Sequence, residues 1–185
     1  MPVVLQKCVK PLMLNPVAPK VDILVRPLVK TDWEAVSRIY KEGIATGIAT
    51  FETEVPSWKL WNKKYIQHCR IVAEHNRKVI GFAVLSQVST REVYNGVAEV
   101  SVYISEQYRR HHIGETLLNK LIKESESIGF WTLQAAIFSE NFASIRLHEK
   151  CGFRVVGIRE KIGRLGGKWH DNHFLERRSK LVFNS

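Results

Sequence analysis

The sequence has few cysteines and no long hydrophobic run, and both absences narrow the class of protein. Three cysteines occur in 185 residues, Cys8, Cys69 and Cys151, at separations that form neither a metal-binding spacing nor a disulfide framework. We therefore expect reduced thiols with packing or surface roles and no metal site, as is typical of a cytoplasmic protein. No apolar stretch approaches the roughly 18 residues of a membrane-spanning helix, so we expect no membrane partner.

Residues 1–20 contain no acidic side chain and no arginine, but they hold four of the six prolines. Their apolar segments are too short for the core of a secretory signal, and a mitochondrial presequence would contain arginines. We interpret residues 1–20 as a surface extension. One domain with a sizeable core is predicted over residues 21–180, followed by a tail over residues 181–185.

The net charge of +10 and the pI of about 9.7 favour anionic partners. A nucleic acid and a phosphate-bearing cofactor are the two candidates. The basic residues are scattered rather than gathered in one helix or tail, and no stacking-aromatic motif is present, so we expect no nucleic acid partner. Steep salt dependence of DNA or RNA binding would favour the opposite interpretation, a nucleic-acid-binding domain.

The most informative stretch is residues 98–118. Apolar residues at alternate positions from Ala98 predict a strand, and apolar residues at helical spacing from Ile113 predict a helix that stops at Gly129. The basic turn over residues 109–114 lies between them. A turn that leads into a helix offers unpaired N–H groups and the positive end of the helix dipole, which together bind phosphate. The alternative is an ordinary solvated turn.

The rest of the chain predicts further elements around this stretch. Strands are expected over residues 22–28, 70–74, 78–87, 131–138, 153–162 and 168–175, with a hairpin turn over 75–77 and another over 163–167. Helices are expected after a cap at Thr31 or Asp32, from Pro56, and over residues 142–150. This mixed order predicts the α+β class, with helices packed around one sheet.

Two segments carry a resemblance to a known family. Residues 109–114 read Arg-Arg-His-His-Ile-Gly, which is similar to the acetyl-CoA motif Arg/Gln-x-x-Gly-x-Gly/Ala of the GCN5-related N-acetyltransferase (GNAT) superfamily. Residues 141–153 resemble its segment of Asn, small residue, aromatic and Glu-Lys-x-Gly-Phe. Four shorter segments resemble the phosphinothricin and methionine sulfoximine or sulfone acetyltransferase branch: residues 47–52, 98–103, 144–149 and 167–171.

The resemblance runs from about residue 23 to residue 178 and implies a fold and an activity. The fold is that of the superfamily, α/β/α layers with a mixed central sheet of about six to seven strands and about four helices. The activity is direct acetyl transfer, in a ternary complex, from acetyl-CoA to the amino group of a small amino-acid-like acceptor. A homodimer is also implied. The residues implied to hold acetyl-CoA are Ser101, Val102, Tyr103, Arg109, Arg110, His111, His112, Ile113, Gly114, Glu115, Asn141 and Ser144.

One departure from the motif concerns the first glycine, whose place is taken by His112. Glycine there lets the backbone take positive φ angles, which are uncommon for other residues although histidine is among the more tolerant. Either His112 has an ordinary helical conformation or the affinity for the cofactor suffers. We expect binding to survive, because the donors are backbone N–H groups.

The resemblance implies two catalytic residues, Glu99 and His148. Glu99 matches a glutamate that acts as a base, directly or through water, and partial burial would raise its pKa toward that use. The alternative is a structural carboxylate that binds loop backbone. His148 stands where many members have a tyrosine that protonates the leaving thiolate, and imidazole can act as acid or base. The alternative is a histidine that is simply packed.

The acceptor pocket is expected to include Glu99 and residues of two loops: Ile48, Thr50, Phe51, Arg91 and Tyr94. Arg91 suits an acceptor carboxylate or phosphinate, because guanidinium binds such oxyanions in bidentate fashion. A solvated Arg91 and a core Phe51 are the alternatives. Two other functions remain open: acetylation of a cationic amine or a protein N-terminus, which an acidic pocket would favour, and a CoA-binding protein without catalysis.

Overall fold

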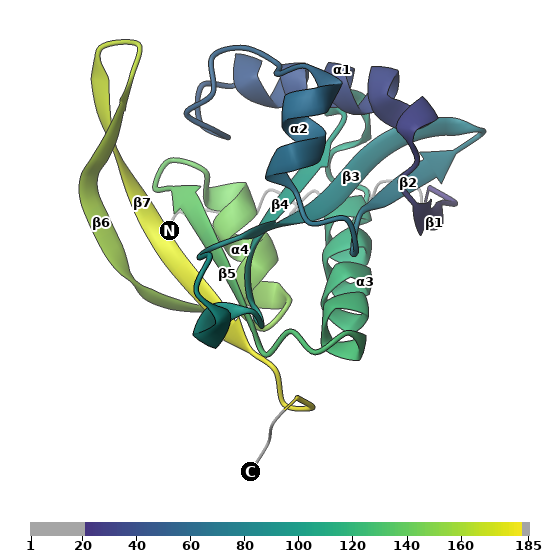
Figure 1. Ribbon diagram of the computed structural model, residues 1–185. Coiled ribbons are helices and arrows are strands. Elements are labelled where there is room, and N and C mark those ends of the chain that lie inside the picture. Colours follow the sequence, from purple (N-terminus) through teal and green to yellow (C-terminus); the bar gives the residue numbers. More distant parts are fainter. Residues whose placement is uncertain (1–20, 183–185) are drawn as a thin grey trace, which may run out of the picture.

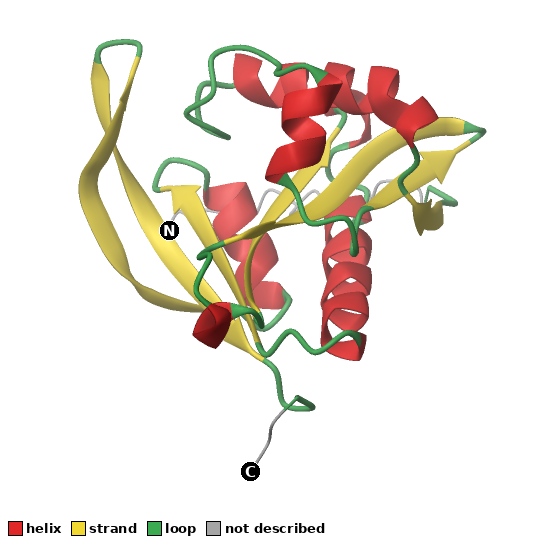
Figure 2. Ribbon diagram, in the orientation of Figure 1, coloured by secondary structure: helices red, strands yellow, loops and turns green. Residues whose placement is uncertain are grey.

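The computed structural model describes residues 21–182, so the predicted extension and residues 183–185 lie outside the described part of the chain. Its sheet has seven strands in the order β1-β2-β3-β4-β5-β7-β6. The strands are β1 (Leu24–Pro27), β2 (Ile71–His75), β3 (Lys78–Gln87), β4 (Val97–Ile104), β5 (Thr132–Phe138), β6 (Arg154–Leu165) and β7 (Lys168–Arg178). The α-helices are α1 (Trp33–Ala45), α2 (Trp58–Lys64), α3 (Ile113–Ser127) and α4 (Phe142–Lys150). The predicted α+β class is confirmed (Figure 2).

The helices form layers on both faces of the sheet (Figure 1). Phe82 and Val84 of β3 pack in a cluster with α1 and α2, whereas the alternate residues Ala83 and Leu85 pack in a cluster with α3. Successive side chains of a strand point to opposite faces, so the two clusters are the two apolar layers of one α/β/α sandwich. No helix among residues 21–182 combines the length and apolarity needed to cross a membrane.

Some predicted bounds are confirmed, and others differ from the observed bounds by one to three residues. β7, for example, ends at Arg178 and not at residue 175. The strand over residues 78–87 and the helix over residues 142–150 have the predicted bounds. The helix expected from Pro56 begins at Trp58, because the Ser57 hydroxyl caps it by accepting from the Leu60 N–H at 3.4 Å. β6 continues to Leu165, so its hairpin turn is confined to two glycines with positive φ, 54° and 84°, rather than extending over residues 163–167.

The feature that positions the site is the divergence of β4 and β5, the parallel pair at the centre of the sheet. They pair at only three positions, ending at Glu99 opposite Gln134. β3 pairs with β4 much further, as far as Ile104. Beyond Glu99, the edge of β4 that faces β5 therefore has no ladder partner, and the two strands separate (Figure 1). Backbone N–H and C=O groups on that edge are available to a ligand.

Candidate active site

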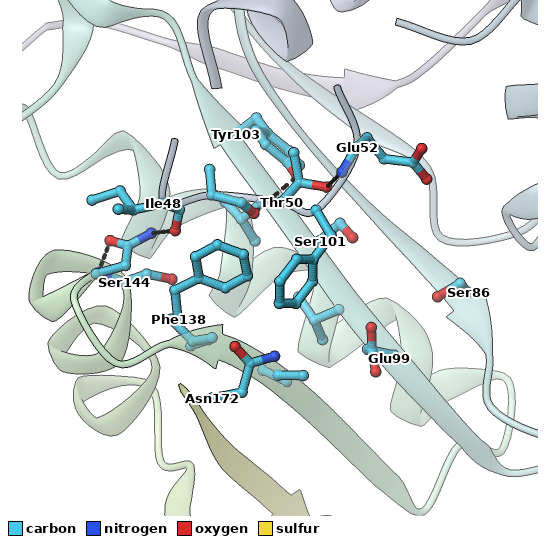
Figure 3. A pocket seen from close by; sticks show the side chains of 18 of the residues that line it. Ile48, Thr50, Glu52, Ser86, Glu99, Ser101, Tyr103, Phe138, Ser144 and Asn172 are labelled. Atoms are coloured by element: carbon cyan, nitrogen blue, oxygen red, sulfur yellow. Dashed lines mark hydrogen bonds between the residues drawn. The ribbon is translucent and has the colours of Figure 1, made fainter. Parts of the chain in front are cut away.

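A cavity of about 460 Å³ lies in the opening between β4 and β5, beneath the loop that follows α1. Four predicted acceptor residues line it: Ile48, Thr50, Phe51 and Glu99. Predicted cofactor residues from β4 and α4 also line it, among them Ser101 and Ser144. Figure 3 shows that the labelled residues of this set gather around one space, although they come from three separate segments: the loop after α1, β4 and α4. We call this space the acceptor cavity.

A second cavity of about 630 Å³, here called the donor cavity, lies at the N-terminus of α3. Residues of the predicted cofactor set line it: Val102, Tyr103, Arg109, Arg110, His112, Ile113, Gly114, Glu115, Asn141 and Ser144. His111 lines neither cavity. Val102, Tyr103, Asn141 and Ser144 line both. The two cavities therefore meet along the open edge of β4 and the N-terminus of α4.

The structure does not bring Arg91 and Tyr94 into the acceptor cavity. Both side chains are exposed in the loop between β3 and β4, where the Arg91 guanidinium lies 5.6 Å from the centre of the Tyr94 ring. That loop precedes the paired end of β4, away from the opening. The cation–π contact gives Arg91 a partner there, as a surface arginine often has.

Glu99 lies at the point where β4 and β5 separate. Burial raises the pKa of its carboxyl group, and this effect outweighs a hydrogen bond from the Gln134 side chain at 3.5 Å. The charged form is disfavoured in a partly dry site unless a cation or a donor accompanies it. A carboxylate of this kind accepts a proton more readily than an exposed one.

His148 is buried on α4 and has a defined tautomer. Its Nδ1 lies 2.8 Å from the Ser144 carbonyl oxygen, which only accepts, so Nδ1 carries the hydrogen. Nε2 is buried and has no partner among residues 21–182. Burial lowers the pKa of His148, so the ring is neutral near pH 7 and Nε2 is an acceptor. His148 also lines the acceptor cavity.

Asn141 lines both cavities and connects two elements there by hydrogen bonds. Its side-chain oxygen caps α4 by accepting from the Ser144 N–H at 3.2 Å, and its amide nitrogen donates to the Ile48 carbonyl at 3.3 Å. The loop after α1 is thereby tied to the N-terminus of α4 (Figure 3). Loss of this side chain would remove a helix cap and release that loop.

His112 takes the left-handed conformation that its position in the motif suggests. Its φ is 59° and its ψ is 9°, at the N-cap of α3, so the helical alternative is wrong. Its Nδ1 lies 3.2 Å from a Glu115 carboxyl oxygen. A Cβ added at Gly114 would lie 3.0 Å from the Leu147 side chain, so the backbone approaches α4 closely here. The first N–H groups of an α-helix have no intrahelical partners, so this end of α3 could hold an anion.

Several polar residues of the acceptor cavity were missed at the sequence level, and only Glu52 of these lies in a segment that carries the resemblance. They are Tyr40, Glu52, Lys64, Tyr65, Ser86 and Asn172. Lys64 Nζ lies 2.9 Å from a Glu52 carboxyl oxygen, and burial raises the pKa of Tyr65 to about 12. For Lys64 and Tyr65, the only sequence signal was their place at the end of the helix predicted from Pro56. Their convergence on β4 depends on the fold.

A helix end suited to phosphate and a buried carboxylate lie on either side of an open strand edge, and this arrangement is typical of one class of enzyme. Such a site holds a phosphate-bearing donor against a second substrate, as a group transferase requires. The chain matches the pattern described as "Acetyltransferase (GNAT) family" over residues 33–153. The protein therefore belongs to the GNAT family and is an acetyltransferase.

Individual relatives agree with this assignment. A phosphinothricin N-acetyltransferase of Streptomyces viridochromogenes is 32% identical over 161 residues, covering 85% of this chain and 88% of that protein. An L-methionine sulfoximine/L-methionine sulfone acetyltransferase of Salmonella typhimurium is 28% identical over 152 residues, covering 80% and 89%. A phosphinothricin acetyltransferase of Sinorhizobium meliloti, solved with acetyl-CoA, is 30% identical with a TM-score of 0.81, covering 88% of this chain and 91% of that one.

Proposed function

We propose that this protein transfers the acetyl group of acetyl-CoA to the amino group of a small amino-acid-like acceptor of the phosphinothricin, methionine sulfoximine or methionine sulfone type. The observation that carries the proposal is the meeting of the donor and acceptor cavities along β4. We assign the activity to a domain over residues 21–180. The free cysteines Cys69 and Cys151 support a cytoplasmic location.

The donor cavity suits acetyl-CoA. The N–H groups at the start of α3 and the side chains of Arg109 and Arg110 would hold the diphosphate. The unpaired edge of β4 at Val102 and Tyr103 would hold the pantetheine arm, and an N–H group there would polarise the thioester carbonyl. Asn141 and Ser144 border the other side of the arm.

Transfer requires two proton movements, for which the site offers two groups. Glu99 would remove a proton from the acceptor ammonium, directly or through water, before the nitrogen attacks the thioester carbon. Attack leaves the nitrogen with one further proton to lose. His148 lines the acceptor cavity and its Nε2 is an acceptor, so His148 would take up that proton and pass it to the thiolate as the C–S bond breaks. Burial raises the pKa of Cys69 to about 11 and also raises that of Cys151, so neither is a good nucleophile and direct transfer is favoured.

The charges of the acceptor cavity favour an amino-acid-like acceptor over a polycation. Lys64 pairs with Glu52, which leaves Glu99 as the single unpaired carboxylate among the described lining residues. The test is thiol release from acetyl-CoA with phosphinothricin, methionine sulfoximine, methionine sulfone, a polyamine and an aminoglycoside. We expect turnover on the first three. Turnover confined to the polyamine and the aminoglycoside would contradict the acceptor class.

The pH dependence of the reaction should reveal the raised pKa of Glu99. The base is active when ionised, so kcat/KM should rise with pH through a pKa above the ordinary glutamate value of 4.5. Below that pKa the carboxyl is protonated and the rate falls. Initial rates across the acidic range would measure this limb. A profile of the same shape in Glu99→Gln would assign the limb to another group.

His112→Gly should relieve backbone strain without loss of cofactor binding. A non-glycine residue in the left-handed region costs on the order of 1–3 kcal/mol, partly offset here by the contact with Glu115. We expect the free energy of unfolding to rise by up to about 1 kcal/mol and the Kd for acetyl-CoA to stay within about threefold. Urea unfolding and calorimetric titration would measure both. A large loss of affinity would show that the imidazole itself binds the cofactor.

We also propose that the protein is a homodimer that uses β6, an edge strand that exposes several large apolar side chains. Val156 is 46% exposed, Ile158 55% and Ile162 51%. A long exposed edge of this kind is a template for pairing with a second copy. Light scattering should give a dimer for the wild type and a monomer for Ile158→Lys, with Ile128→Lys on α3's far end as the dimeric control. A monomeric wild type would contradict this proposal.

A further inference from the structure

Asn172 of β7 is a buried polar side chain that the mechanism above does not use. It is only 7% exposed and it lines the acceptor cavity. Its Oδ1 is buried and has no hydrogen-bond partner among residues 21–182. Figure 3 shows its amide group pointing into the cavity, on the opposite side from the loop that carries Thr50.

The strand register places Asn172 at the level where the two cavities meet. Glu99 pairs with Gln134, and four residues further along β5, about 13 Å, Phe138 pairs with Asn172. β4 runs parallel to β5, so the same step leads from Glu99 to Tyr103, which lines both cavities. Asn172 therefore faces the open edge of β4 across the space where acetyl group and acceptor come together.

The neighbours of Asn172 leave its amide oxygen unsatisfied. Phe138 stacks on His170 at 4.8 Å, and the His170 Nδ1 is engaged with Glu140 at 3.1 Å. Arg159, opposite Asn172 on β6, lies over the Phe174 ring at 4.1 Å. A buried amide oxygen without a donor is costly, and native proteins rarely keep one. A ligand that enters the cavity with an N–H donor would satisfy it.

We propose that Asn172 is an acceptor-binding residue whose Oδ1 accepts a hydrogen bond from the acceptor amino group. The inference rests on the proposed function and deepens it. Because Asn172 lies about 13 Å along the sheet from the level of Glu99, an amino group bonded to Asn172 passes its proton to Glu99 through water rather than directly. A primary amine, once deprotonated, still has two N–H groups, so it can donate one to Asn172 while its lone pair faces the thioester. A secondary amine has only one, which it must also give up as the amide forms. Asn172 therefore selects primary over N-methylated amines.

The test compares Asn172→Leu, Asn172→Asp and a matched control, Asn119→Leu, which makes the same change at an exposed position of α3. Each is assayed with the best acceptor of the panel and with its N-methyl derivative. We expect Asn172→Leu to lower kcat/KM for the primary amine by about 10- to 100-fold and to leave the N-methyl rate unchanged. Asn172→Asp keeps the accepting oxygen and should retain more activity than Asn172→Leu.

Stability supplies a readout that separates binding from folding. Leucine has the same branched skeleton as asparagine without the unsatisfied polar group, and the cavity gives room for its methyl groups, so the melting temperature of Asn172→Leu should hold or rise and stabilisation by acetyl-CoA should persist. An unchanged kcat/KM, or a lower melting temperature with loss of acetyl-CoA binding, would overturn the inference. Absence of acceptor turnover by the wild type would instead overturn the proposed function, and this inference with it.

Discussion

Glu99→Gln is expected to lower kcat by about 10²- to 10⁴-fold, the usual contribution of a positioned general base. Glutamine keeps the size of the side chain and its hydrogen bond to Gln134 but cannot take up the proton of the acceptor ammonium. Glu99 lines the acceptor cavity and not the donor cavity, so stabilisation of the variant by acetyl-CoA should equal that of the wild type. Steady-state rates with saturating acetyl-CoA measure the first effect and thermal shift the second.

The control for this experiment is Glu34→Gln, which removes an exposed carboxylate from the first turn of α1. It should have wild-type kcat, because Glu34 lines neither cavity. A kcat for Glu99→Gln within about twofold of the wild type would show that Glu99 is a structural carboxylate, the alternative that the sequence left open.

Trp61→Ala is expected to lower the free energy of unfolding by about 3–5 kcal/mol, the range for truncation of a fully buried large side chain. Trp61 has no exposed surface. Its ring centre lies 5.4 Å from that of Trp33, 4.8 Å from that of Tyr65, and 5.4 Å from the guanidinium carbon of Arg70. Packing of Trp61 therefore holds α2, a helix of only seven residues, against the sheet.

Leu60→Ala is the matched control on the same helix, because Leu60 is 62% exposed and its truncation should change stability by less than about 0.5 kcal/mol. Urea denaturation would measure both variants. Since α2 ends in Lys64 and leads to Tyr65, both in the acceptor cavity, Trp61→Ala should also raise KM for the acceptor more than KM for acetyl-CoA. A loss of stability below about 1 kcal/mol would mean that α2 is held by other contacts.

The elements could be predicted from the sequence wherever the signal was local. The apolar run of β3 and the cap and stop of α4 predicted the bounds of both elements to the residue. The turn at Asn76 and Arg77, with φ of 48° and 61°, also follows from local chemistry, since Asn tolerates the left-handed region. The start of α2 was misplaced because two signals competed, and the Ser57 cap prevailed over Pro56.

The divergence of β4 and β5 could not be predicted, because strand register depends on contacts between distant segments. The same limit explains why Lys64 and Asn172 were missed. Each is an ordinary polar residue in the sequence, and it lines the acceptor cavity only because the fold brings its element close to β4. The conformation of His112 stayed open for a different reason. Histidine tolerates a positive φ but does not require one, so the backbone conformation of His112 depends on the geometry of the whole turn.

Part of the positive charge of the chain lies at the donor cavity. Arg109, Arg110, Arg146 and Lys150 line it, and Lys150 pairs with Glu115 at 2.7 Å. A phosphate-bearing cofactor suits this local concentration of basic residues.

The most direct test of the account is to incubate the protein with acetyl-CoA labelled in the acetyl group and with methionine sulfone, and to follow acceptor and protein by mass spectrometry. The account predicts one labelled acetyl group on the amino nitrogen of the acceptor and none on the protein at any time. Label that appears first on the protein, or that never reaches the acceptor, would contradict it.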